Sequence, residues 1–107
     1  MVTERLSYLP DNLPDYRPCP PASQREFWQA LPASAQERWC KAGEDALAQP
    51  IAPLPLTAWL DFTRTGRRTG WEDAYFSRRA RLCALVLAEC VQHSGRCLEP
   101  VLDMLWA

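Results

Sequence analysis

The stretch GWEDAYFSRRARLCALVLAECVQH, residues 70–93, carries the longest helical pattern in this chain of 107 residues. In its first half, apolar residues recur at helical spacing with arginines between them, which predicts an amphipathic helix. The side chains expected to point inward are Trp71, Tyr75 and Leu82, and the arginines are expected to point outward. The second half, LCALVLA (82–88), is apolar all round and predicts a segment that is covered on every side. The run HSG (93–95) is expected to end this helix.

Four more helices are predicted around this one, over about 24–31, 35–48 and 56–65 and from Leu98 onward. Three of the five helix starts match the pattern S/T-x-x-E, with hydroxyls at Ser23, Ser34 and Thr69 and acids at Glu26, Glu37 and Glu72. This pattern predicts a capping box, in which the hydroxyl and the glutamate each accept a hydrogen bond from a free backbone amide. Gly66 is expected to cap the carboxyl end of the third helix.

The sequence contains no sustained period-two alternation and no Asn-Gly or Asp-Gly turn, so no strand is predicted. The alternation of helices and short loops predicts an all-α fold of antiparallel helical hairpins. Its length allows one domain at most, and 48% hydrophobic residues with five tryptophans are typical of a globular fold.

Residues 1–22 hold five of the ten prolines and are predicted to form an irregular arm ahead of a helical domain at 23–107. The arm is too apolar for a free tail and is expected to lie across another surface. The apolar residues concerned are Leu6, Tyr8, Leu9, Leu13 and Tyr16.

Charge is distributed unevenly along the chain. The net charge is −1, which argues against a general nucleic-acid-binding protein. Between Asp61 and Arg81, however, six arginines face three acidic residues, so this segment carries +3 and the remainder −4. Either a polyanion or a set of internal ion pairs would use this local excess.

The five cysteines include no C-x-x-C pair, and a single histidine accompanies them, so neither a zinc site nor any cofactor is predicted. Cys83 and Cys90 lie seven residues apart in an apolar run. We expect them to be small buried hydrophobic side chains in a reducing compartment; a disulfide or metal role is the alternative.

The N-terminus has no basic segment followed by an apolar one, so no signal peptide is predicted. The longest apolar run, 82–88, is too short to cross a bilayer. These features predict a cytoplasmic protein without a membrane partner.

The arginine-rich segment also contains aromatic residues, and it has two interpretations. Guanidinium groups bind carboxylate or sulfate in a bidentate manner, and an aromatic ring stacks on a sugar, so the segment would bind an anionic ligand. Alternatively, Arg64, Arg78 or Arg79 would pair with Asp61, Glu72, Asp73 or Glu89 and lock the corner between two helices. The candidate residues are Arg64, Arg67, Arg68, Trp71, Glu72, Tyr75, Arg78 and Arg79.

No residue stands out as catalytic. Glu72 is assigned to a capping box, and Glu89 is expected to pair with an arginine or to be exposed at the helix end. His93, near a helix C-terminus, has no partner nucleophile. The sequence contains no G-x-S-x-G, H-E-x-x-H or phosphate-binding glycine loop.

Residues 60–90, LDFTRTGRRTGWEDAYFSRRARLCALVLAEC, resemble the N-terminal part of bacterial heparinase II/III-like proteins. There the same stretch has the form F-S-R-T-G-N-R, then Y-E, then Y-F-x-R-R, then L-x-L-A-E-C. Residues 95–107, GRCLEPVLDMLWA, resemble that family's G-R-F-L-D-x-I-x-x-G-I-W-A. The resemblance extends over about 25–107. It departs at 68–71, where the family has a tyrosine before the glutamate, and at Cys97, where it has phenylalanine.

The resemblance implies that the chain is the first part of an α/α toroid whose remainder is the rest of the same chain. The parent would be a polysaccharide lyase acting on uronic acids by β-elimination, or a relative with another substrate. The family's catalytic groups lie further along the toroid and none maps onto this sequence, so the segment is expected to be inert by itself. Acidic polysaccharide is the implied ligand.

The C-terminal residues suggest a second function from a different class. Val101, Leu102, Leu105 and Trp106 form an apolar stripe, and the sequence stops there without a polar cap, which suggests truncation of a longer chain or a split gene. The alternative hypothesis is a freestanding helical interaction module that self-associates through this stripe, because large apolar patches seldom stay in water.

Overall fold

The computed structural model describes residues 17–107, and this part of the chain is helical with no strand. Five helices follow one another: α2 (Arg25–Gln29), α3 (Ala33–Ala48), α4 (Leu56–Thr65), α5 (Thr69–Gln92) and α6 (Leu98–Trp106). The all-α prediction is confirmed, and each predicted helix is present within two residues of its expected bounds. The predicted arm at 1–22 and its apolar residues up to Tyr16 fall largely outside the described residues.

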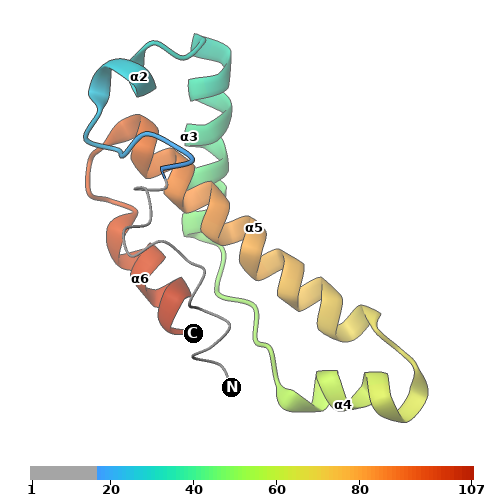
Figure 1. The fold of residues 1–107 in the computed structure, drawn as a ribbon. Coiled ribbons are helices and arrows are strands. Elements are labelled where there is room, and N and C mark those ends of the chain that lie inside the picture. Colours follow the sequence, from blue (N-terminus) through green and yellow to red (C-terminus); the bar gives the residue numbers. More distant parts are fainter. Residues whose placement is uncertain (1–16) are drawn as a thin grey trace, which may run out of the picture.

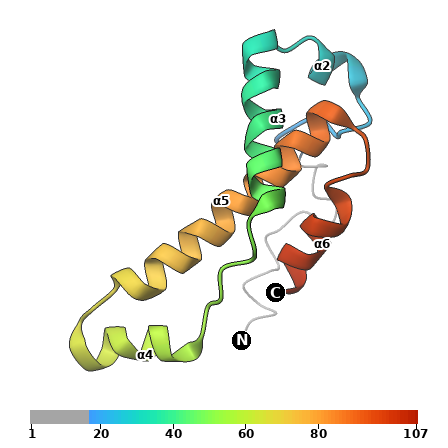
Figure 2. The same cartoon turned by 180° about the vertical axis from the view of Figure 1, so that it is seen from behind.

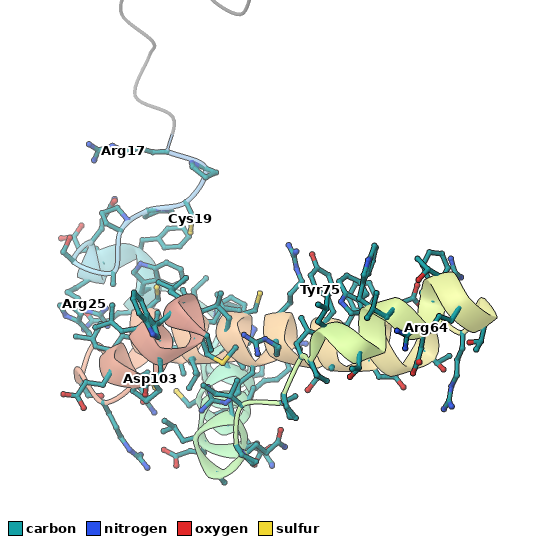
Figure 3. The ribbon with its side chains drawn as sticks, turned by 90° about the horizontal axis from the view of Figure 1, so that it is seen from below. Arg17, Cys19, Arg25, Arg64, Tyr75 and Asp103 are labelled. Atoms are coloured by element: carbon teal, nitrogen blue, oxygen red, sulfur yellow. The ribbon has the colours of Figure 1, made fainter. Side chains whose placement is uncertain are left out.

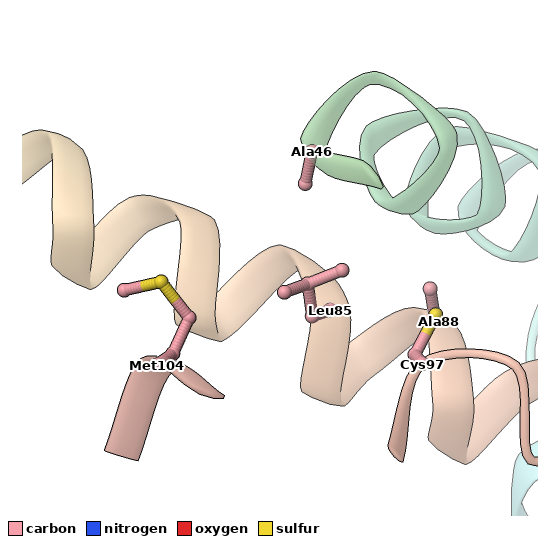
Figure 4. Close-up of a cluster of buried hydrophobic side chains, with 5 residues drawn as sticks. All are labelled: Ala46, Leu85, Ala88, Cys97 and Met104. Atoms are coloured by element: carbon pink, nitrogen blue, oxygen red, sulfur yellow. The ribbon is translucent and has the colours of Figure 1, made fainter. Parts of the chain in front are cut away.

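Helix α5 is the element against which the other four helices pack. Figures 1 and 2 show α3 crossing its C-terminal half, α6 running back along it, and α4 lying beside its N-terminal end. The buried core lies where α3, α5 and α6 meet. Figure 4 shows its members: Ala46, Leu85, Ala88, Cys97 and Met104.

The α3–α5 crossing is close because small residues face each other there. Gly43 of α3 lies directly over Ala88 of α5, and a β-carbon built on Gly43 would stand 2.3 Å from the Ala88 Cβ. Helices approach this closely only where a side chain is missing, so Gly43 sets the distance between the two helices.

The three predicted capping boxes are not formed. The N-caps of α2, α3 and α5 are Gln24, Pro32 and Arg68, and none makes a side-chain capping hydrogen bond. Helix α3 begins at Ala33, before Ser34, and α5 begins at Thr69 itself, so both hydroxyl residues lie inside the first turn and cannot act as N-caps. At α3, the fixed φ of Pro32 places its carbonyl to accept from the amides of Ala35 and Gln36.

Arginines from neighbouring elements instead bind the carboxyl ends of the two long helices. The Arg25 guanidinium of α2 donates to the carbonyl oxygens of Cys90 and Val91, both at 2.7 Å. Arg81 of α5 donates through Nε to the carbonyl oxygens of Ala46 and Gln49, at 3.1 and 3.3 Å. Cations are favoured at helix C-termini, where carbonyl groups lack partners.

The predicted ends of α4 and α5 are confirmed. Gly66 adopts a left-handed conformation with φ 75° and donates its amide to the Phe62 carbonyl at 2.9 Å. His93 ends α5, also in the left-handed region with φ 49°, and Gly95 follows with φ 81°. These conformations turn the chain back so that α6 runs along α5.

Two expectations for α5 are wrong. The apolar run 82–88 is not covered on every side, because Cys83 and Val86 are exposed. The arginines of α5 do not all point outward, since Arg78 and Arg81 are half-buried against backbone carbonyls. The described helices α3 and α6 cover only part of the circumference of α5, which leaves an apolar strip open.

Glu89 was expected to pair with an arginine or to be exposed at the helix end, and both expectations are wrong. Its side chain is buried. Its carboxylate accepts from the backbone amides of Gly95 at 2.6 Å and Cys97 at 3.0 Å. The side chain therefore holds the α5–α6 turn and binds the amino end of α6, where free amides favour an anion.

The described helices leave much apolar surface in contact with solvent. The Cα radius of gyration is 18.6 Å, compared with about 13 Å for a compact domain of this size. Ten large hydrophobic side chains are exposed, most of them on α4 and α6. Within residues 17–107, no helix combines the length and apolar character needed to cross a membrane.

Candidate binding site at the α4–α5 corner

The corner between α4 and α5 is a tight turn of three residues, 66–68, that brings the two helices side by side. Thr65 ends α4 with its hydroxyl donating to the Asp61 carbonyl at 2.8 Å. Arg67 reaches across the turn, where its Nε donates to the Thr69 hydroxyl at 3.4 Å. Local polar contacts thus fix the turn, and its arginines project from it into solvent.

Aromatic rings from both helices form a continuous cluster at this corner. The rings of Trp71 and Tyr75 stack with centroids 4.6 Å apart and an interplanar angle of 16°. Trp59 of α4 meets Trp71 edge-on at 5.2 Å, and Phe62 lies 5.9 Å from Trp59. Such ring pairs add about 0.5–1.5 kcal/mol beyond their area burial, so the cluster holds α4 against α5.

A surface hollow of about 200 Å³ opens at this cluster. It brings together three of the predicted site residues, Arg68, Trp71 and Glu72, and adds Trp59 and Phe62, which sequence reasoning did not assign to the site. Their spacing could have indicated that they belong together, because positions 59 and 62 are three apart and share one face of α4.

The remaining predicted site residues lie elsewhere along α5. Tyr75, Arg78 and Arg79 line a second hollow of about 270 Å³, with Leu54, Leu82 and Met104 as its other walls. Arg64 is exposed on α4, and Figure 3 shows it on the same half of the molecule as Tyr75. Six of the eight candidates therefore line two adjacent hollows, while Arg64 lies at the end of α4 and Arg67 in the connecting turn.

The arginines of the corner make few ion pairs. Within residues 17–107 the corner contains one, Arg68 Nε to Glu72 Oε1 at 3.5 Å, and both side chains are solvent-accessible. The expected pairs of Arg64, Arg78 and Arg79 with Asp61, Asp73 or Glu89 are absent from this part of the chain. Arg78 donates instead to the Ala52 carbonyl at 3.1 Å.

Arg79 bonds to an aromatic residue of its own helix. Its guanidinium donates to the Tyr75 hydroxyl and lies 5.2 Å from the Tyr75 ring centroid. Exposed ion pairs such as Arg68–Glu72 stabilise by at most about 1 kcal/mol, so most of the positive charge at this corner remains available to a ligand.

The described residues contain no group of three or more histidine, cysteine or acidic side chains placed to hold a metal ion. All five cysteines lie within the described residues, and all five are free thiols. Cys97 is buried, Cys90 is half-buried, and Cys83 is exposed, so the prediction of burial is wrong for Cys83. Its position on the open strip of α5 explains the difference.

Thiol reactivity is expected to follow this pattern of burial. Burial first, and then the Glu89 carboxylate, raise the pKa of Cys97 above its ordinary value of 9.0, and burial likewise raises that of Cys90. At pH 8, iodoacetamide should alkylate Cys83 rapidly and Cys97 only after unfolding, as mass spectrometry of timed samples would show. Equal rates for the two thiols would contradict this expectation.

The same shift has a consequence for stability at high pH. Because the folded pKa of Cys97 is raised, the unfolded chain releases the thiol proton first, and stability should fall as the pH rises above about 9. Urea unfolding of the wild type and of Cys97→Ala at pH 8 and pH 10 measures this effect. A smaller pH dependence is expected for the variant.

The chain matches no protein-family model and no curated protein.

Proposed function

We propose that this chain is the N-terminal helical portion of a heparinase II/III-like carbohydrate-active protein, and that its α4–α5 corner contacts an acidic polysaccharide. The observation that carries the proposal is the composition of the corner. An aromatic hollow is lined by Trp59, Trp71 and Arg68. Two exposed arginines lie next to it, Arg64 in the last turn of α4 and Arg67 in the connecting turn.

The chemistry of the corner suits an acidic sugar. The carboxylate of a uronic acid, or a sulfate, pairs with a guanidinium fork, while the apolar face of the sugar ring covers an aromatic side chain. The resemblance supports the same interpretation, because its R-T-G element is found here at 64–66, where α4 ends and the turn begins. In this proposal the helices begin an α/α toroid of paired helices, and the catalytic groups of the parent lie outside this chain.

A binding measurement tests the proposal. Titration calorimetry with heparin and hyaluronan should detect binding that a neutral dextran of similar length does not show. The variant Arg64→Gln/Arg67→Gln/Arg68→Gln is expected to bind at least 10-fold more weakly, since each charge-assisted contact contributes about 1.5–3 kcal/mol in a favourable site.

A matched control separates a specific site from general charge attraction. The variant Arg38→Gln/Lys41→Gln/Arg96→Gln removes the same charge from α3 and from the α5–α6 turn, away from the corner. It should bind like the wild type. Equal losses in the two variants, or equal binding of dextran, would overturn the proposal.

A second candidate function is favoured by the surface of α6. Its outer face, defined by Leu98, Leu102, Leu105 and Trp106, is exposed over most of its area. The predicted stripe included Val101 in place of Leu98, and this assignment is wrong, because Val101 packs against the core. We propose as the alternative that the chain is a helical interaction module that self-associates through this face. Sedimentation equilibrium over a series of concentrations tests it, and a monomer at every concentration would exclude it.

A further inference from the structure

The α6 outer face forms one continuous ridge. Its four residues follow one another at spacings of four, three and one, which places them on one side of the helix. The opposite side of α6 faces the core: Met104 is buried in the core cluster, and Val101 packs against that cluster. Trp106, at the end of the ridge, is 93% exposed and therefore contacts no other part of the described chain to any extent.

The ridge carries negative charge and no positive charge. Glu99 and Asp103 lie next to its leucines, both are exposed, and neither makes an ion pair within residues 17–107. Helix α6 contains no lysine or arginine. A symmetric contact between two α6 ridges would bring four carboxylates together without a cation, and like charges at close range oppose such an interface.

The α4–α5 corner has the complementary properties. Trp59 and Phe62 are 44% and 38% exposed, and both line a hollow of about 200 Å³. Beside it lie Arg64, in the last turn of α4, and Arg67, in the connecting turn. Both are exposed and make no ion pair in the described part of the chain. The corner is thus an apolar recess with a basic rim.

The ridge and the recess do not contact each other within one chain. Figure 3 shows Asp103 and Arg64 toward opposite ends of the molecule. Because Trp106 is 93% exposed, it does not occupy the hollow of its own chain. A contact between them therefore requires two molecules.

We propose that two copies of this chain associate head to tail, with Trp106 of one copy inserted into the α4–α5 hollow of the other. Glu99 and Asp103 of the first copy then face Arg64 and Arg67 of the second. The proposal rests on the second candidate function and specifies its contact surfaces. Because ridge and recess are different surfaces, each added copy leaves both kinds exposed, and assembly continues beyond the dimer.

The test uses the full 107-residue chain in sedimentation equilibrium. The wild type is expected to grow past the dimer with concentration, and higher salt should weaken the association because screening shortens the range of the charge interactions. Trp106→Ala is expected to weaken the association about 30-fold, as for a central aromatic anchor of an interface. Circular dichroism checks that each variant is folded.

Charge reversal tests the pairing of the two surfaces. Glu99→Arg/Asp103→Arg and Arg64→Glu/Arg67→Glu should each lose self-association at least 10-fold when alone. An equimolar mixture should recover it, because each variant then supplies the surface that the other lacks. The control Arg38→Glu/Lys41→Glu reverses the same number of charges on α3 and should associate like the wild type.

Two results would overturn the proposal in distinguishable ways. If Arg64→Glu/Arg67→Glu associates like the wild type while Trp106→Ala does not, the contact is a symmetric one between α6 ridges. If the wild type is a monomer at every concentration, self-association itself fails. Neither result bears on polysaccharide binding, which is measured separately.

Discussion

Replacing Gly43 by alanine is expected to lower the free energy of unfolding by about 2 kcal/mol, although alanine is the better helix former. The new Cβ would lie 2.3 Å from the Ala88 Cβ and 3.6 Å from the Ala84 carbonyl oxygen. A β-carbon is fixed by its backbone and cannot rotate away, so α3 and α5 must separate. Overpacking of this kind costs about 1–3 kcal/mol or more, which exceeds the roughly 1 kcal/mol gained in helix propensity.

The measurement is urea unfolding followed by circular dichroism, with Gly70→Ala as the matched control. Gly70 is also helical, in the first turn of α5, but a β-carbon there meets nothing within 4 Å. Gly70→Ala should therefore leave stability unchanged or raise it by up to about 1 kcal/mol.

A second variant distinguishes a steric clash from a general loss of stability. In Gly43→Ala/Ala88→Gly the two side chains exchange sides of the crossing, so the contact distance is preserved. This variant should recover most of the loss, because the roughly 1 kcal/mol of helix propensity lost at position 88 offsets the roughly 1 kcal/mol gained at position 43. A Gly43→Ala protein as stable as the wild type would show that the helices are not in close contact here.

Replacing Glu89 by alanine is expected to lower the free energy of unfolding by about 3 kcal/mol. The buried carboxylate accepts from the amides of Gly95 and Cys97, and the loss of a charged acceptor leaves both donors without a partner. Each such hydrogen bond contributes about 1.5–3 kcal/mol, and an unsatisfied buried amide carries a comparable cost. The turn between α5 and α6 should loosen as well.

Two further variants calibrate this result. Glu89→Gln keeps one acceptor oxygen but turns an amide donor toward a backbone N–H, so an intermediate loss of about 1–2 kcal/mol is expected. Glu37→Ala removes an exposed carboxylate from α3 and should change stability by less than about 0.5 kcal/mol. A Glu89→Ala loss as small as that of Glu37→Ala would mean that water replaces the carboxylate.

The sequence predicted helices well and their contacts poorly, for one physical reason. Helical spacing, prolines and Gly66 are local signals, and they placed five helices within two residues of their observed bounds. The S/T-x-x-E pattern is also local, but it competes with other ways to begin a helix. At α3, Pro32 is the N-cap, two residues ahead of Ser34, so the helix has already begun where the hydroxyl was expected to cap it.

The candidate site was predicted in part. Arg68, Trp71 and Glu72 line one hollow as a group, which their nearness in sequence made expected. Trp59 and Phe62 join them only because the turn at 66–68 folds α4 back against α5. Sequence spacing across a turn does not show which side chains meet, so their part in the hollow was not foreseen.

The sequence by itself determined the all-α character, the helix bounds and the left-handed end of α4 at Gly66, because these depend on residues within one or two turns of each other. Only the tertiary structure decided the roles of Arg25, Arg81 and Glu89. Arg25 and Arg81 bind carbonyl groups 65 and 35 residues away in the chain, and Glu89 binds amides across a turn. A charged side chain forms a hydrogen bond with whichever unpaired backbone group lies within reach, and packing alone sets which one that is.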